Sequence, residues 1–205
     1  MNSQEHWQNV YQSKAATETS WFQSHLHTSL DWIAQAKPDR SASILDVGSG
    51  ESTLVDDLLA SGYRALTILD LAPQAIERSR QRLGDAAASV NWVAGDITHV
   101  PLPPAAYDLW HDRAVFHFLT EPGQRLDYMR QLTQSLKPDG HVIFATFGPE
   151  GPEKCSGLPT MRYDEQSISQ QFGPGFRLVR NAIVAHTAPF ETQQQFLYCH
   201  LARIA

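Results

Sequence analysis

Residues 43–50 read Ser43-Ile44-Leu45-Asp46-Val47-Gly48-Ser49-Gly50, a short apolar run that leads directly into a glycine turn. The apolar run predicts a buried β-strand, and the apolar residues from Leu54 to Leu59 beyond the turn recur at helical spacing. The two glycines allow the backbone to bend sharply and allow a ligand to lie against bare main chain at the start of a helix. We therefore expect a strand–turn–helix unit with a ligand site in its turn.

Further strands are predicted on both sides of helical segments along the rest of the chain. The alternation of strands and helices indicates βαβ units and a parallel sheet. The last two strands are joined by a loop too short for a parallel crossover, so we expect them to pair antiparallel. The sequence thus predicts an α/β three-layer sandwich with a mostly parallel seven-stranded sheet and a C-terminal antiparallel strand. The strands after the first are expected at 65–70, 90–94, 107–111, 141–147, 176–185 and 195–202.

The chain of 205 residues is expected to form a single domain over 1–205. We assign 1–40 to an N-terminal helical cap, 41–147 to a ligand-binding core, and 148–205 to a lid loop and a C-terminal β-hairpin. The net charge of −6 argues against a partner nucleic acid, and no apolar run is long enough for a membrane span. Without an export signal, and with two cysteines that we expect to be reduced, the protein is predicted to be cytoplasmic, as a monomer or homodimer.

Aspartates end three successive predicted strands, at Asp46, Asp70 and Asp96. The carboxyl ends of parallel strands meet at one edge of a sheet, where such folds bind ligands. Asp70, with Leu71 beside it, is placed to accept the hydroxyls of a ribose. Asp96 is placed to accept from an adenine amine, and the backbone N–H of Ile97 to meet the ring. The alternative is that the aspartates only cap helices.

The charge of Asp46 decides which nucleotide fits. A nicotinamide-binding turn prefers Gly-x-Gly-x-x-Gly, but Thr53 stands at the third glycine position, and Asp46 would repel a pyrophosphate. A cationic sulfonium ligand with an ammonium group would be attracted to Asp46 instead. We therefore expect Asp46, Gly48 and Gly50 to hold S-adenosylmethionine, with S-adenosylhomocysteine as the product.

Together these motifs resemble the class I, Rossmann-like, seven-strand S-adenosylmethionine-dependent methyltransferases, in the family's order and spacing over residues 43–147. One departure is Ser52, where many members carry a third glycine. The motifs are Ile44-Leu45-Asp46-Val47-Gly48-Ser49-Gly50, Leu69-Asp70-Leu71-Ala72-Pro73, Gly95-Asp96-Ile97, Tyr107-Asp108-Leu109-Trp110 and Leu136-Lys137-Pro138-Asp139-Gly140.

The N-terminal residues resemble those of small methyltransferases, among them protein lysine methyltransferases. The resemblance implies that Trp7 and Tyr11 close the cofactor pocket and places Trp21 near the substrate; the alternative is that these rings only pack a helix on the sheet. Most of the chain also looks like a small bacterial methyltransferase type of unassigned substrate, through residues 110–118 and 154–158.

Ionisable residues at the end of the fourth predicted strand are the candidate catalytic group. His111 or Asp112 would orient or deprotonate the acceptor, and His111 would also border the cofactor. Arg113 would anchor a carboxylate or the cofactor loop. The alternative is that ion pairs among His111, Asp112 and Arg113 only hold the loop. His117 is a weaker substrate candidate and is more often a satisfied surface or core histidine.

Cys155 is a further substrate candidate, because Lys154 would favour its thiolate. A thiolate there would suit a soft acceptor such as a thiol or a metalloid oxyanion; the alternative is a small residue in a lid. No metal site is expected, since no Cys/His spacing resembles a zinc site and His25 and His27 would face opposite ways on a helix.

The leading functional expectation is methyl transfer to a small-molecule acceptor. A thiol and a metalloid are candidate acceptors. Modest loops cover the site, and the sequence has no large inserted domain. A protein lysine methyltransferase is the main alternative and would need an open acidic groove. A non-catalytic S-adenosylmethionine-binding protein is a third, and a nicotinamide oxidoreductase comes last.

Overall fold

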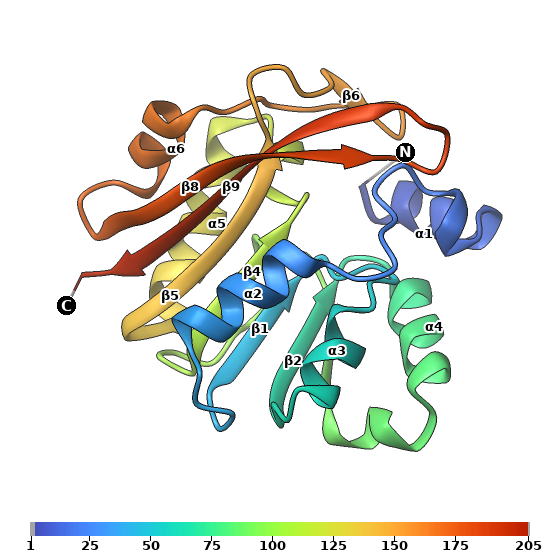
Figure 1. Ribbon diagram of the computed structural model, residues 1–205, viewed down its shortest axis with the longest axis horizontal. Coiled ribbons are helices and arrows are strands. Elements are labelled where there is room, and N and C mark those ends of the chain that lie inside the picture. The colour runs from blue at the N-terminus through green and yellow to red at the C-terminus, as the bar shows by residue number, and fades with distance from the viewer. Residues whose placement is uncertain (1–2, 205) are drawn as a thin grey trace.

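A seven-stranded sheet forms the centre of the protein in the computed structural model, which describes residues 3–204 (Figure 1). Its strand order is β3-β2-β1-β4-β5-β9-β8, and β9 runs antiparallel to both of its neighbours while the other strand pairs are parallel. The predicted fold class and the antiparallel strand near the C-terminus are confirmed. The strands of this sheet are β1 (Ser43–Val47), β2 (Ala65–Asp70), β3 (Asn91–Ala94), β4 (Tyr107–Arg113), β5 (Leu136–Phe147), β8 (Phe176–Thr187) and β9 (Gln193–Arg203).

Helices cover both faces of the sheet and give the three layers. Helices α2 and α3 bury apolar side chains against one face, and α5 and α6 bury theirs against the other. Within residues 3–204, no helix is both long and apolar enough to cross a membrane. The α-helices are α1 (Ser3–Ser13), α2 (His27–Ala36), α3 (Leu54–Ala60), α4 (Pro73–Leu83), α5 (Pro122–Ser135) and α6 (Glu165–Phe172); short 3-10 helices are η1 (Ala16–Glu18), η2 (Gly84–Ser89) and η3 (Phe116–Phe118).

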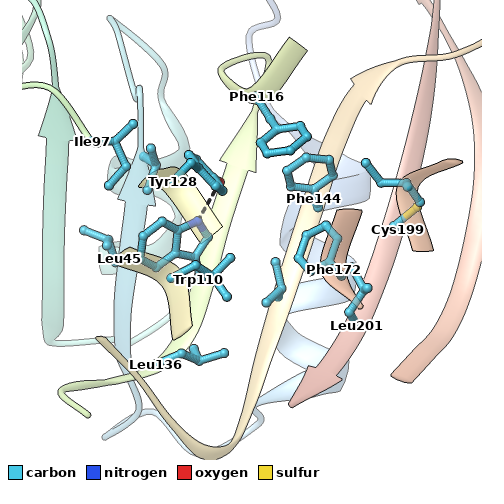
Figure 2. Packing of buried hydrophobic residues seen from close by; sticks show 14 of the residues in the cluster. Leu45, Ile97, Trp110, Phe116, Tyr128, Leu136, Phe144, Phe172, Cys199 and Leu201 are labelled. Carbon is cyan, nitrogen blue, oxygen red and sulfur yellow. Dashed lines mark hydrogen bonds between the residues drawn. The ribbon is translucent and has the colours of Figure 1, made fainter. Parts of the chain in front are cut away.

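Strand β4 shows how alternation along a strand divides its side chains between the two faces. Trp110 points toward α5, where its indole N–H donates to the hydroxyl of Tyr128 at 2.9 Å (Figure 2). Leu109 is buried on the opposite face, in the cluster formed with α2 and α3. His111 and Arg113 are therefore expected on the Leu109 face, and Asp112 on the Trp110 face. This division decides which of them can reach a ligand together.

The segment 148–205 contains more structure than the expected lid loop and hairpin. A two-stranded ribbon, β6 (Lys154–Cys155) and β7 (Leu158–Pro159), lies within the lid segment, and α6 follows it. Helix α6 begins where the carboxylate of Asp164 accepts the backbone N–H of Ser167 at 2.8 Å, and it buries Ile168 and Phe172, one turn apart, against the core. An aspartate before an apolar pair at i and i+4 was a readable signal for this helix.

Candidate active site

The turn after β1 is built so that a ligand can lie close to its backbone. Gly48 and Gly50 have φ of +64° and +56°, in the left-handed region that favours glycine. A Cβ at Gly48 would overlap the side chain of Val115, and one at Gly50 would overlap the hydroxyl of Tyr11. Ser52 keeps the turn, since its N–H donates to the Ser49 carbonyl at 3.0 Å. The turn therefore needs both glycines but not a third.

Asp70 ties this turn to the end of β2. Its carboxylate accepts the backbone N–H groups of Gly50 at 2.7 Å and Ala72 at 2.8 Å, and the residue is 5 % exposed. Burial raises the pKa of Asp70 to about 6, and repulsion from Asp46 adds to the rise, while the backbone N–H groups oppose it. The carboxylate is thus held rigidly beside the glycine turn.

A cavity of about 320 Å³ opens at this carboxyl edge of the sheet. Asp70 and Leu71 border it from the end of β2, and Asp96 and Ile97 from the end of β3. Asp96 accepts the N–H of Thr98 at 2.9 Å, which fixes the carboxylate at the cavity wall. The structure therefore brings together the predicted cofactor residues that follow β2 and β3.

Aromatic side chains from the N-terminal segment close this cavity on one side. The Trp7 ring packs edge-on against Trp21 and Phe118, with centroids 5.7 and 5.0 Å away, and Tyr11 lies 6.4 Å from Trp21. All of these rings border the cavity. We call Trp7, Tyr11, Trp21 and Phe118 the aromatic lid. Burial and the nearby Asp70 carboxylate raise the pKa of Tyr11, so its hydroxyl stays protonated at neutral pH.

Asp46 lies beside the glycine turn in a buried chain of hydrogen bonds. His111 donates from Nδ1 to an Asp46 carboxylate oxygen at 2.6 Å, since a carboxylate only accepts. The Nε2 of His111 meets the Ser29 hydroxyl of α2 at 2.9 Å, and all three residues are at most 2 % exposed. Asp46 and His111 border a smaller cavity of about 50 Å³ that also reaches Gly48. His111 thus holds Asp46 in place.

Asp112 does not face either of these cavities, because it lies on the other face of β4. Its carboxylate accepts the Tyr128 hydroxyl at 2.6 Å and the backbone N–H of Val115 at 2.9 Å, and the residue is fully buried. Burial raises its pKa to about 6. The expected grouping of His111, Asp112 and Arg113 at one catalytic point is therefore wrong, since adjacent strand residues point to opposite faces. Asp112 instead anchors the chain after β4, and the proposed ion pairs of His111 and Arg113 with Asp112 do not form.

His117 is also held in the core. Its Nδ1 accepts the N–H of Phe147 at 3.2 Å, and its ring stacks on the Phe147 ring with centroids 4.1 Å apart. Burial lowers the pKa of His117 to about 3, so the ring is neutral. The residue is fully buried and lies behind the cavity wall, which fits the core histidine alternative rather than a substrate contact.

Cys155 borders the main cavity, but not as a thiolate. The residue is 8 % exposed, and its Sγ lies 3.8 Å from the Ser20 hydroxyl. Burial raises the pKa of the Cys155 thiol. The expectation that Lys154 would favour the thiolate is therefore wrong, because removal of the sulfur from water outweighs the nearby positive charges.

Arg113 stands where the cavities meet. Its Nη1 donates to the Trp21 carbonyl at 3.0 Å, and its guanidinium lies 4.7 Å above the Phe196 ring. Its Nε is buried without a hydrogen-bond partner. Arg113 is the one cationic side chain among the described residues that line the main cavity, and no carboxylate of residues 3–204 pairs with it. An arginine with a free donor edge and no counter-ion is suited to an anionic ligand.

The model of a methyltransferase domain family matches residues 44–140, the part of the chain that carries β1 through the start of β5. Residues 44–140 thus resemble a methyltransferase domain in sequence. The methyltransferase match includes the glycine turn and the aspartates that end β2 and β3.

Named methyltransferases resemble the chain over different lengths. A malonyl-[acyl-carrier protein] O-methyltransferase of Anoxybacillus flavithermus is 37 % identical over 52 % of this chain and 39 % of that protein. The chain thus spans less than half the length of this relative. An EEF1A lysine methyltransferase 2 of Danio rerio is 21 % identical over 88 % of this chain and 77 % of that protein.

Solved methyltransferase structures share the fold. The 1,6-didemethyltoxoflavin-N1-methyltransferase of Burkholderia thailandensis, solved with 1,6-didemethyltoxoflavin and S-adenosylhomocysteine, superposes with a TM-score of 0.70 at 21 % identity. The superposition covers 99 % of this chain and 84 % of the Burkholderia thailandensis enzyme.

The residues present fit S-adenosylmethionine. The glycine turn leaves bare backbone that a Cβ would fill. The buried carboxylates of Asp46 and Asp70 and the exposed carboxylate of Asp96 stand at the three strand ends where a cationic nucleoside would be held. Asp46 would face the ammonium end of the ligand, and Asp70 and Asp96 its sugar and base. Groups of three or more His, Cys, Asp or Glu that could hold a metal ion do not occur within residues 3–204.

Proposed function

We propose that the protein is an S-adenosylmethionine-dependent methyltransferase whose small-molecule acceptor reacts through a group that is already anionic. S-adenosylmethionine, when bound, supplies an electrophilic methyl group on a sulfonium. The protein's own task is to bind the acceptor close to that methyl and to exclude water. The observation that carries the proposal is the unpaired Arg113 at the wall of the main cavity.

The ionisable groups of the cavity favour such an acceptor. Tyr11 and Cys155 stay protonated because burial raises the pKa of each, so neither is placed to take a proton at neutral pH. Asp112 is turned away to the α5 face, and Asp70 and Asp96 belong to the proposed cofactor end. Glu121 also borders the cavity, as an exposed residue at the N-terminus of α5. An acceptor that is anionic before it binds needs no general base, and Arg113 would neutralise and orient it.

The relatives are consistent with this acceptor class. A malonyl group ends in a free carboxylate, and the O-methyltransferases that match this chain are named for it. A carboxylate is therefore the first acceptor to test. Thiolates and metalloid oxyanions are anionic acceptors of the same kind and stay in the panel, although the protonated Cys155 gives them no special support.

A lysine acceptor is disfavoured by the same cation. A lysine side chain that reached the methyl group would bring its ammonium toward Arg113, where like charges repel and no carboxylate of the described residues forms an ion pair with the guanidinium. The matching lysine methyltransferases are also distant, at 21 % and 20 % identity.

Calorimetry and turnover together test the proposal. S-adenosylmethionine should bind the purified protein and NAD should not. S-adenosylhomocysteine release is then measured with carboxylates, thiols, selenite, tellurite, small amines and extracted protein. Turnover with anionic small molecules is expected. Turnover with extracted protein alone would overturn the small-molecule assignment, and no turnover with any of them would favour a non-catalytic binding protein.

Arg113 variants separate its possible partners. Arg113→Met should raise the acceptor KM at least tenfold while leaving the affinity for S-adenosylhomocysteine within about twofold, because a buried charged hydrogen bond is worth about 1.5–3 kcal/mol. Arg113→Lys keeps the charge and should recover part of the loss. Loss of S-adenosylhomocysteine affinity with an unchanged acceptor KM would instead assign the arginine to the cofactor carboxylate and refute its role in acceptor binding.

A further inference from the structure

A side cavity of about 200 Å³ lies next to Arg113 and outside the main cavity. Arg113 and Phe196 border both cavities, so these two side chains stand between them. The side cavity is formed by the segment that enters α2, by β4 and by the β8–β9 hairpin. Its lining residues are Gln23, His25, His27, Thr28, Arg113, Val184, His186, Phe196 and Tyr198.

The described lining of the side cavity has cationic and donor groups but no carboxylate, although the chain as a whole has a net charge of −6. Arg113 contributes a guanidinium whose Nε is buried and unpaired. Helix α2 begins at the cavity with His27 and Thr28, and neither a side-chain cap nor an acidic residue occupies its first turn. The first N–H groups of α2 therefore lack intrahelical partners and add a partial positive charge.

Two further imidazoles border the cavity. His25 and His27 are both exposed, and their ring centroids lie 5.8 Å apart. The expectation that these rings face opposite ways on one helix is wrong, because α2 begins only at His27. The Asp57 carboxylate, which is not part of the cavity lining, holds His25 through Nδ1 at 3.0 Å.

His186 supplies the specific feature of this cavity. The residue is 2 % exposed, and its Nε2 lies 2.8 Å from the Ser20 carbonyl, so Nε2 carries the hydrogen and donates. Its Nδ1 is buried without a partner. Burial and the neighbouring Arg113 lower the pKa of His186, so the ring stays neutral and Nδ1 presents a lone pair. An unpaired buried acceptor is costly, and a ligand with a hydrogen-bond donor would satisfy it.

We propose that the side cavity binds an oxyanion that carries its own O–H group, of which hydrogenphosphate is the simplest. Its charged oxygens would accept from the Arg113 guanidinium and from the first N–H groups of α2, and its O–H would donate to Nδ1 of His186. A fully ionised oxyanion such as sulfate matches the cation and the helix end but has no hydrogen for His186. The site is therefore expected to distinguish oxyanions by whether they carry an O–H group rather than by their net charge.

Titration of the purified protein with inorganic phosphate and with sulfate at pH 7.5 tests this proposal by calorimetry. Saturable phosphate binding is expected, with sulfate at least tenfold weaker. His186→Gln can keep a donor toward the Ser20 carbonyl but removes the Nδ1 lone pair, so phosphate affinity should fall about tenfold. His141→Gln, at the opposite end of β5 from the cavities, is the matched control and should bind phosphate as the parent protein does.

Equal affinity for phosphate and sulfate, no saturable phosphate binding, or unchanged binding by His186→Gln would each overturn the proposal. If the variant does not fold, imidazole nitrogen NMR of the parent protein decides, because phosphate should shift the Nδ1 resonance of His186 and sulfate should not. Phenyl phosphate tests whether the bound oxyanion is a free ion or the charged end of a longer molecule. Tighter binding than inorganic phosphate indicates the charged end of a longer molecule, and weaker binding indicates a free oxyanion.

Discussion

Replacement of His111 separates two jobs that this buried residue performs. Its Nδ1 holds Asp46, and its Nε2 meets Ser29. In His111→Asn the amide nitrogen lies close to the position of Nδ1, so the contact with Asp46 can persist while that with Ser29 is lost. In His111→Gln the longer side chain favours the Ser29 contact, and Asp46 loses its donor. We expect the glutamine variant to weaken cofactor binding far more than the asparagine variant.

The size of the effect follows from the geometry. The bond from His111 to Asp46 is 2.6 Å long, and both residues are at most 2 % exposed, so no water replaces the lost donor. A hydrogen bond to a charged group contributes about 1.5–3 kcal/mol. That range corresponds to roughly a tenfold to 150-fold loss of affinity. The loss should fall on the amino-acid end of the cofactor, which Asp46 is proposed to face.

The assay compares two ligands by calorimetry. S-adenosylhomocysteine carries the ammonium that Asp46 would bind, whereas 5′-methylthioadenosine lacks the whole amino-acid end. His111→Gln should weaken the first within the stated range and leave the second within about twofold, because only a charged partner uses the ion contact. Ser29→Ala is the control at the other end of the chain of hydrogen bonds. Equal losses for both ligands, or equal behaviour of the two His111 variants, would refute the positioning role.

Three further predictions concern other parts of the site and fold. Gly50→Ala should lower cofactor affinity at least tenfold by calorimetry, because the new Cβ would collide with Tyr11 at a left-handed φ, whereas Gly84→Ala, with open space around it, should leave affinity unchanged. Cofactor affinity should fall as pH drops below about 6, where Asp70 gains a proton, and Asp70→Asn should bind weakly with a flat pH profile. The pKa values of the paired His141 and His200 are lowered by burial, that of His200 to about 4, so their contribution to stability is present above the unfolded pKa and is lost as pH falls from about 6.5 toward 4; Tm measured from pH 8 to 4.5 should drop, and less steeply in His200→Gln.

Local sequence signals were enough for the sheet and for the cofactor end of the site. The glycine turn and the aspartates at strand ends act through their own backbone neighbourhood, so their order along the chain places them at one edge. The Asp164 cap and the apolar pair that follows it are an equally local signal for helix α6. The start of β5 at Leu136 was harder, because Asp139 and Gly140 signalled a turn, yet Asp139 takes φ of +59° within the strand limits.

The acceptor end could not be read in the same way. The adjacency of His111, Asp112 and Arg113 in sequence suggested one site, and only the extension of β4 to Arg113 shows that alternation divides them. The burial of Cys155 depends on packing against β9 and the aromatic lid, which no local pattern reports. The lack of an ion pair between Arg113 and any carboxylate of residues 3–204 is likewise a property of the assembled fold.

The bond between Arg113 and the Trp21 carbonyl has a consequence for the order of events in a catalytic cycle. The Arg113 guanidinium holds the segment that contains Trp21 and also borders the main cavity, where the anionic acceptor is proposed to bind. An acceptor that draws the Arg113 side chain toward itself would weaken the hydrogen bond to the Trp21 carbonyl. Conversely, a strong hydrogen bond to Trp21 leaves fewer Arg113 donors for the acceptor. Closure of the Trp21 segment over the nucleoside and binding of the acceptor therefore compete for the same side chain, that of Arg113.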